Sequence, residues 1–504
     1  MKAIRRLAIF IMAIIIMIMP NMSFAENGVC HIGNKSYESL EAAFNEAGDG
    51  DTIVLDKNVL VDTQITISNN VALDLNGNTI TNAVVNERLF NVAASSFTVD
   101  GTITGSAMVI PDSNEASYGF IKISEPSIVT LNGGNYSGNT DNGAFVKIFN
   151  DNVIDASGST VVFNNVTMSS NNAFFNTDTL NTDADTTTLA VTGGTYTTEG
   201  KAFGVDTYAL SPVTFEGVTV TAGAGPCIEV CGASASFADC NFKVTGTNSN
   251  GFGTTAVAVS WGGNAVIDGG TYSSENGYGI YVYNSGGHIT IKDGTVSGGK
   301  AAVKADKDKQ SGVPSSIIVE GGNTIGAWET NDEIEAPLIV YGGTHTADVS
   351  DYIADDVKIV DNGDGTYSVG IDCIVTFYDE NGKEIADSSI TVLSGTIIGK
   401  DNAPSLSKEG YTFAGWFEKN SNEPWNLDED RVSGKMSLYA RWTANSTDDG
   451  EGTDDGSQSG QSENGDKSVE TGDDSNVVLW ACILAFSIVG GTGVVIYGRK
   501  RKEQ

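Results

Sequence analysis

LAVTGGTY, residues 189–196, contains the pattern that determines the fold of this 504-residue chain. Its large apolar side chains, Leu189 and Val191, lie two residues apart, which is typical of a β-strand with one buried face. Gly193 and Gly194 then supply a tight turn, and the final Thr-Tyr pair begins a second strand. Similar segments recur through the chain. They are LDLNGNTI (73–80), FTVDGTI (97–103), VTLNGGNY (129–136), VVFNNVTM (161–168), VTFEGVTV (213–220), SFADCNF (236–242), AVIDGGTY (265–272), ITIKDGTV (289–296), IIVEGGNT (317–324) and LIVYGGTH (338–345).

Most copies are preceded by a further short strand such as Ile280–Tyr283. A unit of this size cannot bury its own apolar face, but stacked units bury it between them. The sequence therefore predicts an all-β protein in which residues 26–370 form a parallel β-helix, or solenoid. A string of β-sandwiches is the alternative, but its turns would not recur with the same Gly-Gly-Thr-Tyr chemistry. The pattern resembles the right-handed β-helix of the pectate-lyase-like superfamily.

The two ends of such a solenoid need cover, because open strand edges pair with other chains. The spacing of Tyr37, Leu40, Phe44 and Ala47 predicts a capping helix over residues 37–47. Its N-cap would be Ser36, with Glu38 in the first turn, and a first strand would follow at 53–55.

A hairpin is expected to close the other end, with strands at residues 357–360 and 367–369 around DNGDG (361–365). The acidic residues of this turn offer calcium ligands as an alternative role. They lack the twelve-residue ligand spacing of an EF-type loop, so a plain turn is favoured.

A second domain is expected over residues 371–442, where the texture of the sequence changes. VTF (375–377), GYTFAGW (410–416) and LYARW (438–442) resemble the Listeria–Bacteroides repeat, a small β-grasp-like module of bacterial surface proteins. Tyr411, Phe413, Trp416 and Trp442 are expected to form its core, since large apolar groups dominate the burial of small domains. A ligand-binding aromatic patch is the alternative.

Residues 443–467 are mostly small, polar or acidic and offer little to bury, so they predict an extended disordered linker.

The C-terminal segment, 468–504, combines a short motif, an apolar stretch and a basic tail. The motif is Ser468-Val469-Glu470-Thr471-Gly472, and the apolar stretch 477–497 is long enough to cross a hydrocarbon core of ~30 Å. The basic tail, residues 499–502, would stay cytoplasmic. This order resembles the sorting signal of Gram-positive surface proteins, in which a sortase cuts between Thr and Gly and joins the Thr to peptidoglycan. Val469 stands where that family has proline. A plain single-span membrane anchor is the alternative.

Residues 1–25 predict a signal peptide. Basic residues precede an apolar run at 7–19, and Ser23-Phe24-Ala25 offers small side chains to a signal peptidase, which would cut between Ala25 and Glu26. Together the two ends predict a protein exported and then retained on the extracellular face of the cell envelope.

The formal net charge of −36 argues against nucleic acid as a partner, because phosphate binding needs clusters of Lys and Arg. Cys227, Cys231 and Cys240 cluster without the further Cys or His that a zinc site needs. Small core residues in adjacent coils are the favoured interpretation of these cysteines, and a disulfide is the alternative.

Composition and motifs do not favour an enzyme, and no cofactor or metal is expected. A pectate-lyase-type site needs a basic residue facing uronates, and Arg88 is the one arginine between residues 26 and 370. Asn176-Thr177-Asp178 and Asn181-Thr182-Asp183 imitate one fragment of a polygalacturonase pattern without its partners. His31, His288 and His345 lie in unrelated places, and the latter two are expected to face solvent. A polysaccharide lyase or glycoside hydrolase remains the alternative, through carboxylates of neighbouring coils.

A surface-displayed binding or adhesion protein is the favoured function, with glycans or host surfaces as ligands. Tyr281 is expected to point outward, and Tyr283 and Trp261 on a neighbouring coil are candidates to stack on sugar rings. Scattered exposed aromatic residues are the simpler interpretation, and a structural spacer is the third function considered.

Overall fold

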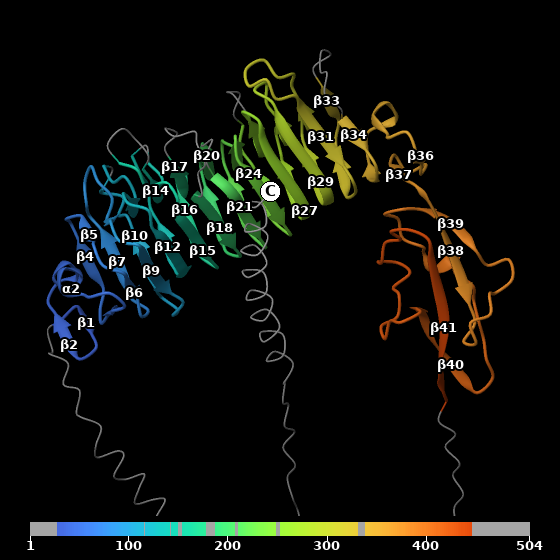
Figure 1. Ribbon diagram of the computed structural model, residues 1–504, viewed down its shortest axis with the longest axis horizontal. Helices are drawn as coiled ribbons and strands as arrows, with labels where there is room; N and C mark the ends of the chain where they lie inside the picture. Colours follow the sequence, from blue (N-terminus) through green and yellow to red (C-terminus); the bar gives the residue numbers. More distant parts are fainter. Residues whose placement is uncertain are drawn as a thin grey trace, which may run out of the picture. The chain divides into compact units, whose positions relative to one another are not determined.

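The computed structural model describes residues 28–114, 116–141, 143–149, 154–177, 187–206, 210–247, 253–330 and 338–445. The signal peptide with its Ala25–Glu26 junction, most of the linker, the sorting motif 468–472 and the apolar stretch 477–497 lie outside these ranges. No helix in the described part of the chain is long and apolar enough to span a membrane. The described residues form a parallel β-solenoid and a small sheet domain (Figure 1).

Each coil of the solenoid contributes one strand to an 11-stranded parallel sheet, here called the single-arm sheet. Its strands are β5 (Ile65–Ile67), β8 (Phe90–Val92), β11 (Ile121–Ile123), β14 (Val146–Ile148), β17 (Phe175–Thr177), β20 (Phe203–Asp206), β23 (Ile228–Cys231), β26 (Thr255–Ser260), β28 (Tyr278–Val282), β30 (Ala301–Ala305) and β33 (Trp328–Thr330).

The coil then crosses a second sheet with two arms, separated by the repeated turn. The first arm comprises β3 (Thr52–Leu55), β6 (Val71–Asp74), β9 (Ser96–Gly101), β12 (Ile128–Gly133), β15 (Thr160–Asn164), β18 (Thr187–Thr192), β21 (Leu210–Glu216), β24 (Ser234–Ala238), β31 (Ser315–Val319) and β34 (Leu338–Val340). The second comprises β4 (Val59–Val61), β7 (Thr79–Asn82), β10 (Ala107–Val109), β13 (Asn135–Ser137), β16 (Thr167–Ser170), β19 (Thr195–Thr198), β22 (Thr219–Ala222), β25 (Asn241–Val244), β32 (Asn323–Ile325) and β35 (Gly343–His345). β27 (Gly263–Ser274) and β29 (Gly287–Gly298) run through both arms.

The repeated segments stack in register, which confirms the predicted solenoid and excludes a string of sandwiches. Leu189 of the LAVTGGTY copy pairs with Val161 of the preceding copy and Val213 of the following one. Val191 and Ile267, at inward positions of their strands, are at most 1% exposed. Alternation along each strand therefore fills the interior with apolar side chains, as the sequence pattern predicts.

Aromatic rings from successive coils contact one another inside the solenoid. Phe120 and Phe145 have ring centroids 4.7 Å apart, and Phe145 continues to Phe174 at 5.8 Å. Phe174 and Phe203 are also 5.8 Å apart. Such pairs add to the burial term, so stacking of coils rather than any single coil supplies the core.

The turn between the two arms needs glycine for two physical reasons. Gly269 and Gly270 have φ values of +86° and +83°, a region that side chains disfavour. A Cβ at Gly270 would also lie 2.0 Å from the carbonyl oxygen of Cys240 in the preceding coil. In other copies Asn76, Asn165 and Asp239 take the left-handed conformation instead.

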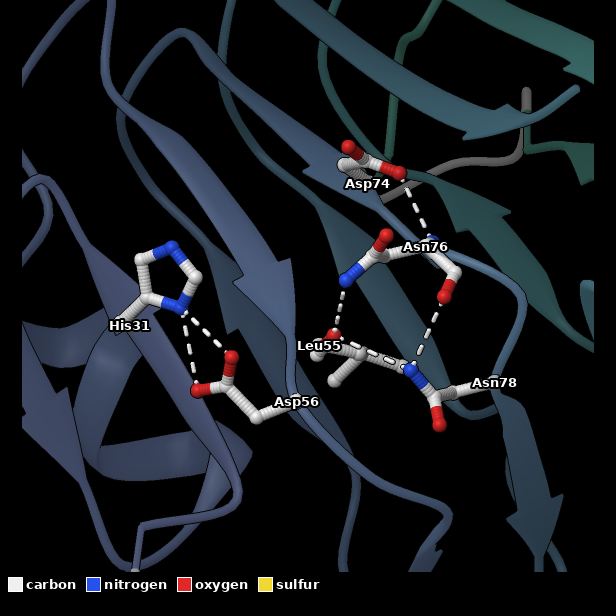
Figure 2. Close-up of polar contacts among 6 residues, drawn as sticks. All are labelled: His31, Leu55, Asp56, Asp74, Asn76 and Asn78. Atoms are coloured by element: carbon white, nitrogen blue, oxygen red, sulfur yellow. Dashed lines mark hydrogen bonds and ion pairs between the residues drawn. The ribbon is translucent and has the colours of Figure 1, made fainter. Parts of the chain in front are cut away.

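Polar side chains at these turns bind backbone groups of neighbouring coils, as Figure 2 shows for the N-terminal coils. The side-chain amides of Asn76 and Asn78 each donate to the carbonyl of Leu55 at 3.0 Å, and Asp74 accepts from the Asn76 N–H at 2.7 Å. The Asn and Asp content of the repeat thus satisfies backbone groups that the turns leave unpaired.

The N-terminal cap differs from the prediction in where its helix begins. α2 spans Leu40–Glu46 with Ser39 as N-cap, whereas Tyr37 ends β2 (Lys35–Tyr37), which pairs with β1 (Cys30–Ile32). The predicted start at Tyr37 with Ser36 as N-cap and Glu38 in the first turn is therefore wrong. The apolar spacing is still used, because Leu40 and Phe44 are buried and Phe44 contacts the Phe90 ring at 5.6 Å.

The C-terminal end is closed by an antiparallel hairpin, as predicted. β36 (Lys358–Asp361) pairs with β37 (Tyr367–Gly370), which pairs with β35, and η1 (Ser350–Tyr352) lies between β35 and the hairpin in sequence.

The prediction that His345 faces solvent is wrong. Its side chain is fully buried, with Nδ1 2.8 Å from the Thr324 hydroxyl and Nε2 3.2 Å from the Gly342 carbonyl. Burial lowers the pKa of His345 to about 4, so the ring is neutral at physiological pH.

The second domain is a four-stranded mixed sheet in the order β39-β38-β41-β40. Its elements are β38 (Asp372–Tyr378), β39 (Ile390–Leu393), η2 (Lys400–Asn402), β40 (Tyr411–Glu418) and β41 (Met436–Ala444). Trp416 is buried against Phe377, and Phe413 and Trp442 are partly buried beside it. Tyr411 is 42% exposed, so its predicted place in the core is wrong.

Cys227, Cys231 and Cys240 form no disulfide in the described structure, so the disulfide alternative is wrong. Cys227, Cys231 and Cys240 are each buried, as the core interpretation expects. Burial raises the pKa of Cys240 to about 11, so its thiol stays protonated.

Substituting Gly270 with alanine should cost much more stability than substituting Gly217. Gly217 has a φ of +62° but open space around its Cβ position, so Gly217→Ala should cost only the left-handed strain, ~1–2 kcal/mol. Gly270→Ala adds the collision with Cys240 and should cost at least ~2 kcal/mol more. Urea unfolding of both variants measures the difference, and equal losses would contradict the close approach of the coils.

Stability should depend on pH through His345. The unfolded histidine binds a proton below its ordinary pKa of 6.5, but the folded one resists protonation down to about 4. Its contribution is therefore complete above pH 6.5 and is lost as pH falls from 6.5 to 4, by ~2 kcal/mol between pH 7 and 5. The His345→Gln variant, which keeps a donor and an acceptor, should lose that much less over the same pH step in urea unfolding. An identical pH response in both proteins would refute this assignment.

Candidate functional site

The outward side chains in the middle of the single-arm sheet form a line that we call the outer ladder. Parallel pairing places one such residue of each coil beside that of the next. Its members are Thr66, Asn91, Lys122, Lys147 and Asn176, and, beyond the glycine of β20, Glu229, Ala258, Tyr281, Lys304 and Glu329. The candidate site lies at its C-terminal end, on β28, β30 and β33.

Tyr281 occupies the centre of this site and is covered by its neighbours. Ile280 and Val282 point into the core, so alternation turns Tyr281 outward as predicted, yet it is only 5% exposed. Its ring contacts Tyr278 and Tyr283 at centroid distances of 5.2 and 5.6 Å. The prediction that Tyr281 offers a free face for stacking on a sugar is therefore wrong, because the adjacent tyrosines and Lys304 pack against it.

Lys304 links the aromatic rings to two carboxylates. Its ammonium lies 5.0 Å from the Tyr278 ring centroid and 5.4 Å from that of Tyr281. It also lies 3.9 Å from a carboxylate oxygen of Asp306 and 3.6 Å from one of Glu329. Burial opposes its charge, but these acids and Tyr278 outweigh that effect and raise the pKa of Lys304.

The hydroxyl of Tyr281 donates to Asp306 at 2.5 Å, which fixes the ring. Burial and this acceptor both raise the pKa of Tyr281, so the phenol stays neutral. An open depression of about 520 Å³ adjoins the network and is lined by Lys304, Asp306, Trp328, Glu329 and Thr330. The arrangement offers a cation, two carboxylates and aromatic edges to a polar ligand.

Trp261 lies at the corner between β26 and β27, on the coil before β28. Its φ is +51°, and every other non-glycine residue described with a positive φ is Asn or Asp. For a bulky side chain this conformation is strained by ~1–2 kcal/mol. The backbone N–H of Trp261 donates to the Ser285 hydroxyl at 3.0 Å, and 39% of the residue is exposed.

Of the three predicted stacking residues, the structure brings Tyr281 and Tyr283 into direct contact. Tyr283 is half-buried, and its N–H bonds the carbonyl of Val259, two residues before Trp261. Tyr278, Lys304 and Asp306 also belong to the site, but the sequence pattern did not predict them. The cluster of tyrosines at 278, 281 and 283 is a signal in the sequence for Tyr278, but only the register between coils places Lys304 beside Tyr281.

The other candidate chemistry is dispersed. His31 binds Asp56 at 2.8 Å in the N-terminal cap (Figure 2), His288 contacts Ser316 at 2.5 Å, and His345 is buried elsewhere. Asn176 and Thr177 belong to β17, and residues 178–186 lie outside the described ranges. Among the described residues, no three His, Cys, Asp or Glu side chains are grouped as a metal site would require.

Comparison with known proteins identifies the small domain. Residues 374–441 match the family model of the Listeria-Bacteroides repeat domain. A stretch of 71 residues is 37% identical to internalin H of Listeria monocytogenes serovar 1/2a (strain ATCC BAA-679 / EGD-e), covering 14% of this chain and 12% of that protein. This chain thus matches only a small part of the length of that relative. No solved structure matches the chain significantly. The C-terminal sheet of this protein is a Listeria-Bacteroides repeat domain, preceded by a β-solenoid.

Proposed function

We propose that this chain is an extracellular, non-catalytic binding protein of the bacterial cell envelope, whose solenoid recognises a glycan through the corner at Trp261. The observation that carries the proposal is a large aromatic side chain held exposed in a backbone conformation that disfavours it. Strain of this kind persists where the surroundings enforce it and clusters at ligand sites. Tryptophan is also the residue type most enriched among energetic anchors of binding surfaces.

Groups on the following coils suit a sugar. Tyr283 presents a half-buried ring one coil along, and Lys304 and Asp306, two coils along, and Glu329, three coils along, supply donors and acceptors for hydroxyl groups. Aromatic residues with one polar end combine an apolar contact with hydrogen bonding, which the two faces of a sugar ring require.

The absence of catalysis is part of the proposal and rests on Arg88 and the histidines. Arg88, the basic residue that a uronate lyase would need, is 5% exposed, and its guanidinium carbon lies 5.3 Å from the Phe149 ring centroid. His345 is fully buried and neutral. These placements disfavour the lyase and hydrolase alternatives.

Attachment to the envelope is inferred from the ends of the chain and from the repeat domain. The partners would be signal peptidase, a sortase and peptidoglycan, acting at Ala25–Glu26 and at the motif 468–472. The partial similarity to internalin H supports a surface location without specifying a ligand.

Replacing Trp261 with asparagine should separate binding from folding. Asparagine tolerates the left-handed conformation, so the melting temperature of Trp261→Asn should be unchanged or higher. Binding to the sugars that wild-type protein selects on a glycan array should weaken about 10-fold or more, because an aromatic anchor is lost.

Tyr341→Asn is the matched control, since Tyr341 is 45% exposed on the solenoid and lies outside the site. It should bind as the wild type does. A Trp261→Asn protein that melts earlier and binds normally would mean that Trp261 is structural. Selection of no glycan by the wild type would reject the proposed ligand class.

Mass spectrometry of cell-wall digests tests attachment. Covalent sorting should yield a C-terminal peptide that ends at Thr471 and carries the mass of a wall cross-bridge. An intact peptide that runs through Gly472 into Asp473, recovered only with membranes, would leave the single-span anchor as the correct alternative.

A further inference from the structure

The N-terminal cap covers two of the three strands that begin the solenoid and leaves the third with an open edge. β1 pairs with the outer edge of β3, and α2 contacts β5. Within the described ranges, β4 pairs with β7 alone, so one edge of β4 has no backbone partner there. An open strand edge presents unpaired N–H and C=O groups and can accept a further strand.

The backbone groups that face this open edge belong to Leu60. The N–H and C=O groups of one residue in a strand point to the same edge, and those of the next residue point to the opposite edge. The carbonyl of Val61 accepts from the N–H of Ala83, which directly follows β7, at 2.7 Å. Val61 therefore faces β7, and Leu60 directs its donor and its acceptor to the open edge.

The side chain of Leu60 also lies in solvent. It is 66% exposed, whereas Val59 and Val61 on either side of it point into the core. A strand laid along β4 would place one of its own side chains beside Leu60, and apolar cross-strand pairs of this kind stabilise sheets. The backbone and the side chain of Leu60 thus offer complementary contacts to the same incoming strand.

A groove of about 250 Å³ follows this edge of β4. One wall is formed by residues 58–63, and the other by Val29 and the segment that leads into α2. Of the described residues that line the groove, none is Lys or Arg, and three carry exposed carboxylates, Glu38, Glu41 and Asp62. None of these carboxylates forms an ion pair within the described part of the chain.

We propose that this groove binds an extended segment of a basic partner protein, which adds to the solenoid as a further strand along β4. The backbone of the segment bonds the N–H and C=O of Leu60, as in other cases of strand addition at a sheet edge. Alternate side chains of the segment lie on the outer face, beside Leu60 and Asp62. An apolar residue with Lys or Arg two positions away matches both.

A second copy of this chain is a poor occupant of the groove. It would bring the same carboxylates together, and the formal net charge of each copy is −36. A basic segment is instead attracted by Glu38, Glu41 and Asp62. The site goes beyond the proposed function, because β4 belongs to the second arm of the two-armed sheet and uses neither Trp261 nor the outer ladder.

The experiment measures binding of a capped, fluorescently labelled peptide, Lys-Val-Leu-Val-Lys, to the full chain by fluorescence anisotropy. The pattern of this peptide is the same in both strand directions. We expect saturable binding that weakens as sodium chloride is added, because part of the attraction is between charges. Hydrogen exchange of the Leu60 amide, followed by mass spectrometry of the segment 58–63, should slow when the peptide binds.

Two altered peptides separate the charge from the strand pairing. Glu-Val-Leu-Val-Glu should bind about 10-fold more weakly or less, because the groove repels it. The lysine peptide with its three central amides N-methylated keeps its charge but loses its strand donors. It should also bind about 10-fold more weakly, since each lost hydrogen bond contributes ~1 kcal/mol.

Variants of the protein test the two groups of contacts. Leu60→Ser should weaken binding about three-fold or more, because it removes the apolar cross-strand pair. Its matched control is Ile128→Ser, since Ile128 is 54% exposed on β12, a strand that pairs on both sides. Glu41→Gln combined with Asp62→Asn should weaken binding about five-fold at low salt. Its control is Glu125→Gln, which changes an exposed carboxylate outside the groove. Both controls should bind as the wild type does.

Failure of the lysine peptide to bind, equal binding of either altered peptide, or an unchanged affinity of Leu60→Ser would overturn the proposal. Slow exchange of the Leu60 amide in the free protein would also overturn it, since the edge would then be paired already. The response of Trp261→Asn on a glycan array bears on none of these outcomes, so this inference and the proposed function can fail separately.

Discussion

Backbone hydrogen bonds between successive coils set the spacing on which the rest of this solenoid depends. Each strand pairs in parallel with strands one coil before and one coil after, as β18 does with β15 and β21. This pairing holds neighbouring backbones ~4.8 Å apart along the whole stack. At the turns the approach is closer still, and a Cβ at Gly194 would lie 2.3 Å from the carbonyl oxygen of Val166. The Gly-Gly turns of the repeat are therefore a consequence of coil spacing.

The same spacing organises the interior, at some cost. Tyr136, Tyr196 and Tyr272 end the Gly-Gly-Asn/Thr-Tyr copies and are among the largest fully buried side chains. The hydroxyls of Tyr136 and Tyr196 have no hydrogen-bond partner among the residues described, and burial raises the pKa of both phenols. Their rings extend the aromatic contacts between coils, for example Tyr196 with Phe203 at 5.2 Å. Ring packing evidently outweighs the loss of hydroxyl hydration at these positions.

On the outside, the fixed register turns a one-dimensional sequence into lines of neighbouring side chains. Residues some 25 apart, such as Lys122 and Lys147 or Tyr281 and Asp306, become direct neighbours. Charges and rings can thus be assembled one coil at a time, without the loops that enzymes use to form a cleft. The two ends of the outer ladder differ in kind. At the C-terminal end Asp306 and Glu329 lie beside Lys304. Nearer the N-terminus, Lys122 and Lys147 lie over the ring of Phe149.

The sequence by itself determined the solenoid, its strands and the second domain. Periodic Gly-Gly turns and two-residue alternation are local signals, and Val191 and Ile267 are buried as their positions in the repeat predict. It could not decide where the capping helix begins. Tyr37 fits a helical spacing but belongs to a strand that pairs with β1, since a tertiary pairing outweighs weak local propensity.

The sequence also could not predict how exposed an outward side chain is. Alternation gives the direction of Tyr281 correctly, but only packing by Tyr278, Tyr283 and Lys304 covers that ring. The hydrogen bond of His345 to Thr324 and the order of residues along the outer ladder depend on which coil lies next, because the register between coils is a property of the folded stack.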